Sequence, residues 1–521
     1  MGRKLIRHSV YSIVYAMFVL LVVLPVGYTL FEAMFSDGTL YQNLQLINND
    51  ILMLLAKSAL IAAAIALLST LFGTLFGFLL YKTRIRFRGL LKIAFLVPLF
   101  ISPYILAVAW KDLFFLLFDS TDIISSTLGV ILVMTTVFTP LSMIIIGSAF
   151  SNIDAQLEES GLLISGFRKT MFKIVLPLIK PALVTSFVLI FIFGISEFSV
   201  PAIFGVRVFT TEIFTQFSAF YNHSLAMLQS TMLIFLCILL LLTERKYIAD
   251  APFFSVGGKG KNNRIYRPGK NGWVNTMLIY GWLFITFLLP FVMLLVHSFR
   301  DGSAAFLQAF NLLKPTFADS IGLAFSAALI IVFIGFIVAY YSEMENKKSL
   351  IWFLLVVFTI PSIVLGISLI KFYNRPILDF IYSGYLIIII GYMGKFSFIS
   401  AKVIANAIKQ IPRSLEEAAL IEGIGFYKRL RDILVPLIMP ALFAVFIISF
   451  IFTLGELGLT IMLYPPGTEI MSIKVFTIMA NAPQALISSM TLIVFSITLL
   501  AVTAMYLIIK PLIKNYSYAD D

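Results

Sequence analysis

Two glutamates, Glu197 and Glu456, are the residues most able to do chemistry in this chain, because both stand inside long apolar runs. An ionised carboxylate in hydrocarbon costs several kcal/mol unless it faces partners or water. The chain has one cysteine, Cys237, and three scattered histidines, so it has neither a disulfide framework nor a cluster of metal ligands. No nucleophile motif or carboxylate pair at catalytic spacing appears. We therefore expect a protein that is not an enzyme and holds no metal or cofactor of its own.

The elements that must position these glutamates are apolar helices. The chain has 521 residues, of which 60% are hydrophobic and 12% charged, whereas a soluble chain is about a quarter charged. At roughly 20 apolar residues for each bilayer crossing, the sequence predicts an all-α polytopic membrane protein with about twelve transmembrane helices, arranged as two homologous six-helix halves. The predicted spans lie near 10–35, 51–80, 90–118, 123–150, 181–204, 224–243, 274–299, 321–342, 350–371, 384–401, 440–463 and 486–509.

Basic residues predict the orientation of these spans. Most of the 38 Lys and Arg residues fall in segments that are cytoplasmic if the N-terminus is inside. This positive-inside pattern predicts a bacterial plasma (inner) membrane protein with both termini in the cytoplasm. Contact with anionic membrane lipid accounts for the net charge of +12, so we expect no nucleic-acid partner.

A hydrophilic stretch divides the chain. Residues 244–273 are rich in glycine and basic residues, which predicts a flexible cytoplasmic linker between a first half, 1–243, and a second half, 274–521. The glycines of this linker do not have the spacing of a nucleotide-binding loop, and no strand precedes them. We therefore expect no ATP site in this chain.

One cytoplasmic segment is repeated in the two halves. The sequence LEESG at 157–161 is matched by LEEAA at 415–419, and PLIKPAL at 177–183 is matched by PLIMPAL at 436–442, an offset of 259 residues from Pro177 to Pro436. Both copies fall between the fourth and fifth spans of their half. Ser414 and Glu417 have the spacing of a capping box, which predicts a short helix that ends in a sharp reversal at Gly423 and Gly425. A mere lipid-facing connector need not keep its sequence in both halves, so the repeat favours a docking role.

The same offset relates Glu456 to Glu197 in the fifth span of each half. One interpretation is that the two carboxylates line or gate a translocation path near a pseudo-two-fold axis. The other is that each carboxylate is hydrogen-bonded to neighbouring helix ends and holds the bundle together. The sequence leaves both interpretations open.

The repeated segment resembles the EAA loop of ABC importer permeases, in which Glu-Ala-Ala is followed by a glycine and then by Ile-x-Leu-Pro. The second copy has Glu417 and Gly423 at the expected spacing, whereas the first copy keeps Glu159 but is one residue shorter before Gly166, so the glycine has no clear counterpart there. The resemblance implies the fold of a type I importer permease, fused two-in-one. It also implies coupling to an ATPase through Glu159, Gly166, Glu417, Ala418, Ala419, Gly423 and Gly425.

A finer resemblance concerns the cargo. Residues 196–205 and 463–469 look like those of fused permeases of the ferric-iron branch, to which thiamine and 2-aminoethylphosphonate permeases are similar. The resemblance implies import of a small solute, with ferric iron the leading choice and thiamine, phosphonate or polyamine as alternatives. It implies two partners: a cytoplasmic ABC ATPase, in two copies, that binds the ATP, and an extracytoplasmic substrate-binding protein.

Two basic residues follow the fifth spans. Arg207 and Lys474 are candidates to meet acidic residues on a docked binding protein, and a solvated rim is the plainer explanation for such charges. An alternative class of protein is an ion-coupled secondary transporter with six plus six helices, in which Glu197 and Glu456 would bind protons or cations. The matched loops after each fourth span favour the ABC importer, because such a carrier does not need them.

Overall fold

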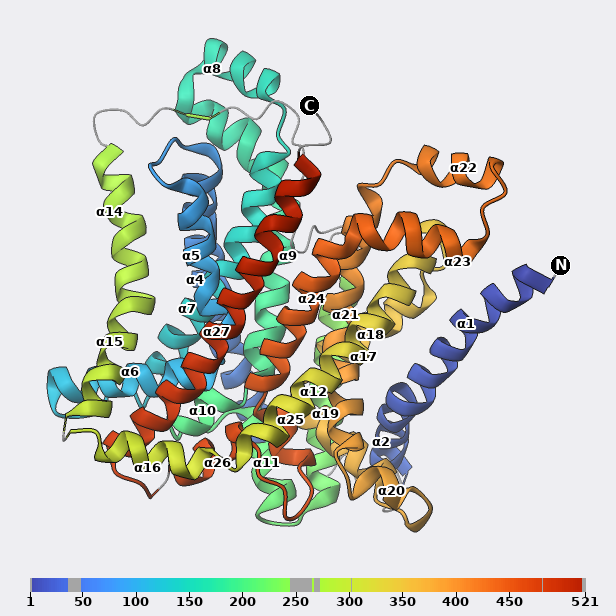
Figure 1. The fold of residues 1–521 in the computed structure, drawn as a ribbon. Helices are drawn as coiled ribbons and strands as arrows, with labels where there is room; N and C mark the ends of the chain where they lie inside the picture. The colour runs from blue at the N-terminus through green and yellow to red at the C-terminus, as the bar shows by residue number, and fades with distance from the viewer. Residues whose placement is uncertain are drawn as a thin grey trace. The chain divides into compact units, whose positions relative to one another are not determined.

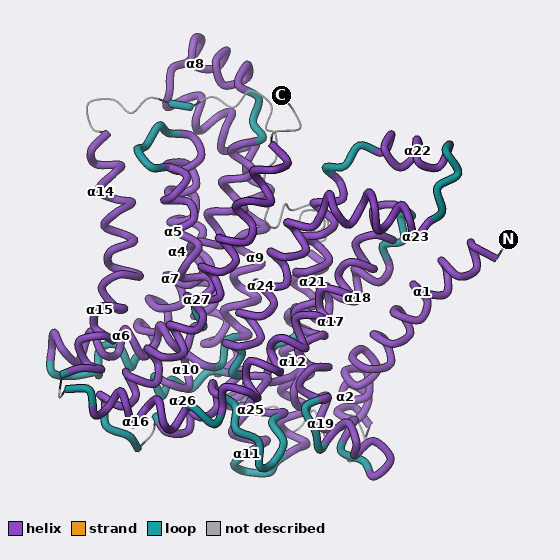
Figure 2. The backbone as a smooth tube through the Cα atoms, in the orientation of Figure 1, coloured by secondary structure: helices purple, strands orange, loops and turns teal. Residues whose placement is uncertain are grey.

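The computed structural model describes residues 2–35, 48–243, 265–266, 272–300, 302–479 and 481–517. Figures 1 and 2 show that these residues are almost wholly helical, which confirms the all-α prediction. Most of the predicted linker, 244–264 and 267–271, lies outside the described residues. Its residue Tyr266 is described and forms an isolated β-bridge with Thr83.

The number of membrane helices agrees with the sequence. Among the described residues ten helical runs are long and apolar enough to cross a membrane, and two further pairs of helices, each sharply bent, bring the number up to 12 if each pair is one span. The ten runs are Val10–Ala33, Asn49–Lys82, Thr127–Ser151, Ala155–Ser196, His223–Leu242, Gly272–Phe299, Thr316–Met344, Leu386–Lys409, Phe426–Gly455 and Gln484–Ala501.

The chain divides into two compact units. Unit 2 comprises 33–312 and 477–493, and unit 1 comprises 1–32, 313–476 and 494–521. The helices of unit 2 are α4 (Asn49–Lys82), α5 (Arg88–Phe100), α6 (Pro103–Phe118), α7 (Thr127–Ser151), α8 (Ala155–Thr170), α9 (Leu176–Ser196), α10 (Ser199–Ile203), α11 (Phe209–Ser218), α12 (His223–Thr243), α14 (Gly272–Leu283), α15 (Leu289–Phe299) and most of α16 (Ala304–Leu313).

Unit 1 repeats much of this order. Its helices are α1 (Gly2–Phe18), most of α2 (Leu24–Phe35), α17 (Thr316–Met344), α18 (Ser349–Thr359), α19 (Ser362–Tyr373), α20 (Asp379–Tyr382), α21 (Leu386–Lys409), α22 (Arg413–Ile421), α23 (Phe426–Arg429), α24 (Val435–Gly455), α25 (Gly458–Leu463) and most of α26 (Met471–Ile478). The last helix, α27 (Gln484–Ser517), contributes residues to both units. Each unit thus includes the first span of the other sequence half. The halves 1–243 and 274–521 remain a prediction about the sequence repeat.

Specific contacts hold these first spans in their units. In unit 1, Tyr11 Oη and Ser349 Oγ share a 3.0 Å hydrogen bond, and Tyr373 Oη donates to the carbonyl of Leu21 over 3.0 Å. In unit 2, Leu294 of α15 is buried with Val108 of α6 in an apolar cluster. Apolar packing and a few polar bonds therefore attach α1 and α15 to the units in which they lie.

The central helix crossing is repeated in both units. In unit 2, α4 crosses α7 so closely that a Cβ added to Gly73 would lie 2.2 Å from Ser142 Oγ. In unit 1, α17 crosses α21, and a Cβ on Gly335 would lie 2.0 Å from Ser400 Oγ. Small residues at such crossings let helix backbones approach within a membrane, where apolar burial alone drives little association. The repeat therefore extends from the sequence to the packing of the core.

The predicted spans 90–118 and 350–371 are each broken. The helix axis bends by 95° between α5 and α6 and by 107° between α18 and α19. The residues before Pro103 and Pro361 are extended, as expected for positions that precede proline. At the second break the buried Lys395 ammonium donates to the carbonyls of Phe358 and Ile360 over 3.2 and 2.7 Å. Lys395, a charge within the predicted span 384–401, thus donates hydrogen bonds to carbonyls that the bend leaves without helical partners.

Candidate coupling loops and membrane glutamates

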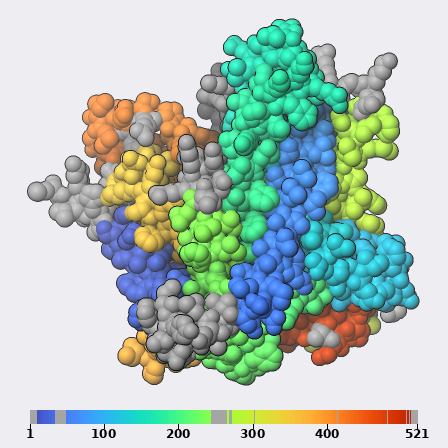
Figure 3. Space-filling view, turned by 180° about the vertical axis from the view of Figure 1, so that it is seen from behind, coloured from blue at the N-terminus to red at the C-terminus, as the bar shows by residue number. Residues whose placement is uncertain are grey.

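The first repeated segment forms a loop at one end of unit 2. Asp154 caps α8 by accepting from Gln156 N over 2.9 Å, and Glu159 is exposed on the first turns of the helix. Figure 3 shows this segment, in teal-green, as a projection at the end of the unit. Gly166 is the exposed turning point, with φ +72° and ψ 172°, and divides α8 into two pieces. We call 155–170 the α8 loop.

A buried ion pair lies beneath the α8 loop. Lys82 Nζ is 2.5 Å from Glu158 Oε1, and the two side chains are 1% and 0% exposed. Tyr266, from the linker, donates its hydroxyl to Glu158 Oε2 over 3.0 Å. Its ring centroid lies 5.6 Å from that of Phe167 and 5.9 Å from that of Phe78. The α8 loop is therefore attached to the end of α4 and to the linker.

This anchor was missed by reasoning from sequence, which selected the neighbouring Glu159. The available signal was Lys82, a charge at the end of an apolar span that needs a partner if it is buried. No comparable signal pointed to Tyr266, because a tyrosine in a basic linker has many other uses.

The second repeated segment forms a loop at one end of unit 1. Glu417 and Ala418 are exposed on α22, whereas Ala419 is only 5% exposed and packs inward. The predicted capping box is absent, because α22 begins at Arg413 with Pro412 as its N-cap and without a side-chain cap. Ser414 is thus already inside the first turn. We call 413–425 the α22 loop.

The end of the α22 loop matches that of the α8 loop. Gly423 has φ +72°, the same value as Gly166, so Gly166 is the structural counterpart that the sequence spacing did not reveal. Gly425 has an ordinary φ of −65° and starts α23. After each loop comes one wide π-helical turn, Met171–Val175 or Leu430–Leu434, followed by Pro177 or Pro436 at the start of the next helix. A proline without an N–H accounts for the wider turn.

The two membrane glutamates cap short helices. Glu197 lies in extended backbone after α9, and its Oε1 accepts from Ser199 N over 2.9 Å and from the Ser199 hydroxyl. Glu456 lies likewise after α24, and its Oε1 accepts from Leu459 N over 3.0 Å. The fifth spans therefore end at Ser196 and Gly455, earlier than predicted, because each carboxylate begins a new helix. Bonding of this kind is what the second interpretation of the glutamates expects, and a place on the translocation path remains a prediction.

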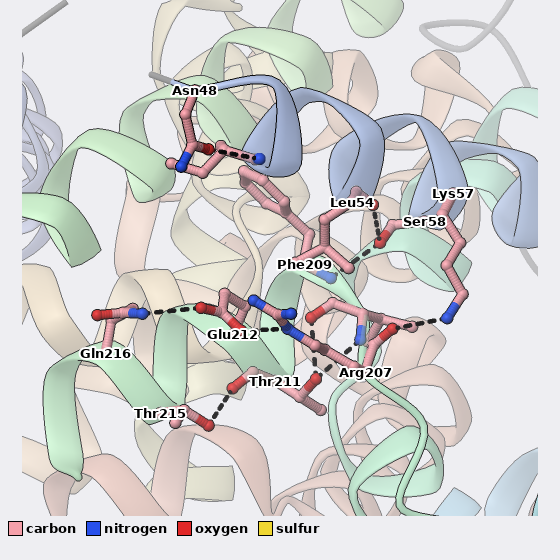
Figure 4. Close-up of polar contacts among 12 residues, drawn as sticks. Asn48, Leu54, Lys57, Ser58, Arg207, Phe209, Thr211, Glu212, Thr215 and Gln216 are labelled. Carbon is pink, nitrogen blue, oxygen red and sulfur yellow. Dashed lines mark hydrogen bonds and ion pairs between the residues drawn. The ribbon is translucent and has the colours of Figure 1, made fainter. Parts of the chain in front are cut away.

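Arg207 and Lys474 are each paired with a glutamate within a turn. Arg207 Nε lies 2.7 Å from Glu212 Oε2, and Lys57 Nζ donates to the Arg207 carbonyl over 3.3 Å (Figure 4). Lys474 Nζ lies 2.9 Å from Glu469 Oε1. Burial tends to raise the pKa of Glu212, but hydrogen bonds from Arg207 and Gln216 bring it below its usual value. The hydrogen bond to Glu212 raises the pKa of Arg207.

No group of three or more His, Cys, Asp and Glu side chains that could hold a metal ion occurs in the part of the chain that the structure describes. Cys237 is buried in α12.

Several known proteins have sequences similar to this chain. Residues 331–515 match the family described as binding-protein-dependent transport system inner membrane component. A relative from Haemophilus influenzae, named for ferric transport, is 24% identical over 90% of this chain and 79% of its own length. The ferric transport system permease of Actinobacillus pleuropneumoniae is 23% identical over 90% of this chain and 73% of its own length.

A third relative is named for a different solute. A permease from Salmonella paratyphi A, named for 2-aminoethylphosphonate transport, is 27% identical over 37% of this chain and 74% of its own length. All these relatives are permease subunits. With its apolar helices, its repeated loops and these matches, the chain is a multi-pass permease subunit of an ABC importer and not an enzyme.

Proposed function

We propose that this chain is the permease of a ferric-iron importer and that the α8 and α22 loops are the attachment sites for a separate ATPase. The cargo assignment rests on the extent of the sequence match, because the two relatives named for ferric transport each align with 90% of this chain. The loops support the coupling role, since each presents an exposed glutamate, Glu159 or Glu417, on a helical segment that precedes a glycine with φ +72°.

The proposed mechanism uses two loops and two ATPase copies. Both termini lie in the cytoplasm, an external binding protein delivers the cargo, and ATP binds to the partner subunits. Closure of the ATPase pair pushes on both loops and favours the conformation open to the outside. Free energy enters only because ATP binds one conformation more tightly than the other.

Glu197 and Glu456 are assigned to the wall of the translocation path. Each stands at the break where a long helix, α9 or α24, gives way to a short one, and its carboxylate is already bonded to backbone N–H groups. Glu456→Gln keeps an oxygen for the cap and removes the charge. Loss of uptake at unchanged thermal stability would support a role in the path, and unchanged uptake would leave only the capping role.

Transport by the purified complex tests the function. The chain is copurified with its ATPase, placed in liposomes, and given iron-loaded binding protein outside and ATP inside. We expect ferric iron uptake that requires ATP and the binding protein. Uptake that proceeds without the ATPase when an ion gradient is applied would instead identify a secondary transporter.

2-Aminoethylphosphonate is the second candidate cargo, favoured by the 27% identity to the Salmonella relative. The same liposomes distinguish the two, because a binding protein loaded with one solute cannot deliver the other. Uptake of the phosphonate and not of ferric iron would overturn the iron assignment while leaving the coupling loops in place.

A further inference from the structure

Residues of α6, α15 and α27 meet in a small apolar cluster of unit 2. Val108 and Ala109 of α6, Leu294 of α15 and Ile487 of α27 are buried together there. The next turn of α6 brings in a carboxyl group, Asp112, whose side chain is 0% exposed. A buried carboxylate costs free energy unless its oxygens are bonded and its charge is balanced or removed.

The two oxygens of Asp112 bond to neutral groups on the first turns of α27. The side-chain amide of Gln484 donates to Oδ1, and Ser488 Oγ lies 2.5 Å from Oδ2. The same Ser488 Oγ lies 2.9 Å from the carbonyl oxygen of Gln484, four residues earlier in its helix. Asp112 thus joins α6 to the beginning of α27.

The number of hydrogens at Ser488 bears on the state of Asp112. A serine hydroxyl has one hydrogen to donate and lone pairs that accept, whereas a carbonyl oxygen can only accept. If Ser488 donates to the Gln484 carbonyl, its contact with Asp112 Oδ2 needs a hydrogen from the carboxyl group. A carboxylic acid supplies that hydrogen, because Oδ2–H donates to Ser488 Oγ while Oδ1 still accepts from the amide.

The helices around Asp112 bring few charges to it. On α6 the neighbouring Lys111 is partly exposed, and on α15 Arg300 is exposed at the end of the helix. Neither α7 nor α10, which also pack against α6, has a charged residue, and α27 has none between 484 and 509. Among the described residues Asp112 is bonded to neutral groups only, whereas a buried carboxylate is stabilised by a bonded cation.

Unit 1 has an ion pair at the corresponding place. Lys371 Nζ of α19 lies 3.7 Å from Glu32 Oε1 of α2, and both side chains are partly exposed. The shift of 259 positions from Ser102 to Pro361, the N-caps of α6 and α19, relates Asp112 to Lys371. A partly exposed lysine of unit 1 is thus replaced by a fully buried acid in unit 2.

The partner positions correspond as well. The π-helical turns that begin at Val19 and Phe284 are 265 positions apart, and the same shift relates Glu32 to His297. The His297 ring is buried against Phe115, with centroids 6.2 Å apart, and its Nε2 has no partner within the described residues. Unit 2 therefore has two buried protonatable side chains where unit 1 has an ion pair.

We propose that Asp112 is a proton-binding site that attaches α27 to α6. The carboxylate takes up one proton from water, and the resulting Oδ2–H donates to Ser488, whose hydroxyl donates in turn to the Gln484 carbonyl. Loss of the proton leaves a buried charge and a single hydrogen for two acceptors, so the beginning of α27 loosens from α6. The site goes beyond the proposed function, since it depends on neither the cargo nor the ATPase.

The alternative is a structural carboxylate that stays ionised and accepts from both Gln484 and Ser488. The substitution Asp112→Asn separates the two explanations. Its side chain has one oxygen and one NH₂ group, so it reproduces the protonated acid: the oxygen accepts from Gln484, and the NH₂ group donates to Ser488 Oγ. It cannot reproduce a carboxylate that accepts at both positions.

The test compares the full-length parent with Asp112→Asn in nanodiscs over a range of pH. Asp119→Asn, the same change at the exposed acid that ends α6, is the matched control. Infrared spectra detect a protonated carboxyl group directly, because its C=O stretch is separate from those of carboxylates and amides. Ser488→Ala is a second variant, which removes the oxygen to which the acid donates and keeps Asp112.

We expect a protonated-carboxyl band at neutral pH in the parent and in Asp119→Asn, and its loss in Asp112→Asn. Ser488→Ala should shift this band. The thermal midpoint of the parent should fall by several degrees as the pH rises to neutral and above, because the folded chain then binds one more proton than the unfolded chain. The fall should be smaller in Asp112→Asn, which should be at least as stable as the parent at alkaline pH.

Three results would overturn the proton site. They are a band that persists in Asp112→Asn, a band that Ser488→Ala leaves unshifted, and an Asp112→Asn chain that is less stable than the parent at every pH or does not fold. Each would leave the proposed function intact, because transport is not part of these measurements.

Discussion

The α8 and α22 loops share one backbone turn, but different contacts hold each loop to its unit. Both turn at a glycine with φ +72°, and in both a π-helical turn and a proline come before the next long helix. Beneath the α8 loop lies the buried Lys82–Glu158 pair, joined by Tyr266. Beneath the α22 loop, the position that corresponds to Lys82 is Met344, which lines an apolar hollow with Leu415 and Ile433.

The two loops therefore have the same backbone geometry but are anchored by different kinds of contact. The Tyr340 ring centroid lies 5.7 Å from that of Phe426 under the α22 loop, where apolar packing is joined by the buried Arg429, which donates to the carbonyl of Ile424 over 3.1 Å. A buried ion pair stabilises only while both partners are present, whereas an apolar contact fails gradually. The α8 loop should therefore respond sharply to single changes and should sense the linker, and the α22 loop should do neither.

Removing one member of the buried pair should have the largest effect. Lys82→Met introduces the residue type found at the corresponding position beneath the α22 loop. It leaves Glu158 charged and buried without its partner, which costs about 3–5 kcal/mol. We expect a large drop in the thermal midpoint of the detergent-solubilised protein and rapid proteolysis within α8. The double variant Lys82→Met with Glu158→Gln should recover most of the stability. A single variant as stable as the parent would break the distinction between the loops.

The turn glycines should come next. Gly166 and Gly423 have φ +72°, and a non-glycine residue there is strained by about 1–3 kcal/mol even though no atom lies within 4 Å of an added Cβ. Gly425 is equally open but has φ −65°. We therefore expect Gly166→Ala and Gly423→Ala to lower binding-protein-stimulated ATP hydrolysis several-fold.

Gly425→Ala is the control for these variants and should behave as the parent. Because Gly166 also has ψ 172°, a region open essentially to glycine alone, its variant should be the more damaged of the two. Equal activity of all three alanine variants would show that the backbone conformation of the turn is unimportant.

The bond to the linker should have a smaller effect. Tyr266→Phe removes the hydroxyl that donates to Glu158 and keeps the ring against Phe167, so the expected cost is about 0.5–1.5 kcal/mol. Amide hydrogen exchange should become faster in α8 and stay unchanged in α22. Tyr427→Phe, at an exposed position of α23 just after the second loop, should change neither. Faster exchange in both loops would indicate that the linker does not act on α8 specifically.

The exposed glutamates should matter least for stability. Glu159→Gln and Glu417→Gln change surface positions, so their effect on unfolding should lie within about 0.5 kcal/mol. If these residues contact the ATPase, both variants should nevertheless weaken its copurification. A variant that loses stability but retains the ATPase would reverse the roles assigned here to Glu158 and Glu159.

The sequence predicted the helices and the repeat because apolar length and a duplicated motif are local signals. It placed Gly423 at a reversal for the same reason. The breaks in the spans 90–118 and 350–371 carried a local signal too, in Pro103 and Pro361, although apolar length concealed it. The prediction of a capping box at Ser414 and Glu417 was wrong, because the helix begins earlier, with Pro412 as its N-cap.

Contacts between distant segments could not be predicted in this way. The Lys82–Glu158 pair and the Tyr266 hydroxyl join three separate parts of the chain, and no spacing within one segment encodes such a meeting. The correspondence of the turns at 205–212 and 467–474 was hidden for a related reason. It is revealed by the hydrogen bonds from Phe209 and Met471 to Ser58 and Ser320, which lie 151 residues away in each case.

As cytoplasmic attachment sites for a separate ATPase, both loops must be reachable from the cytoplasmic side of the membrane. Because Cys237 is the only cysteine and is buried, a single cysteine at position 159 or 417 can be introduced into a Cys237→Ser background. A membrane-impermeant maleimide should label Glu159→Cys and Glu417→Cys in inside-out vesicles only, and added ATPase should protect both. Labelling of either cysteine from the outside, or no protection at either, would contradict attachment of the ATPase to these loops.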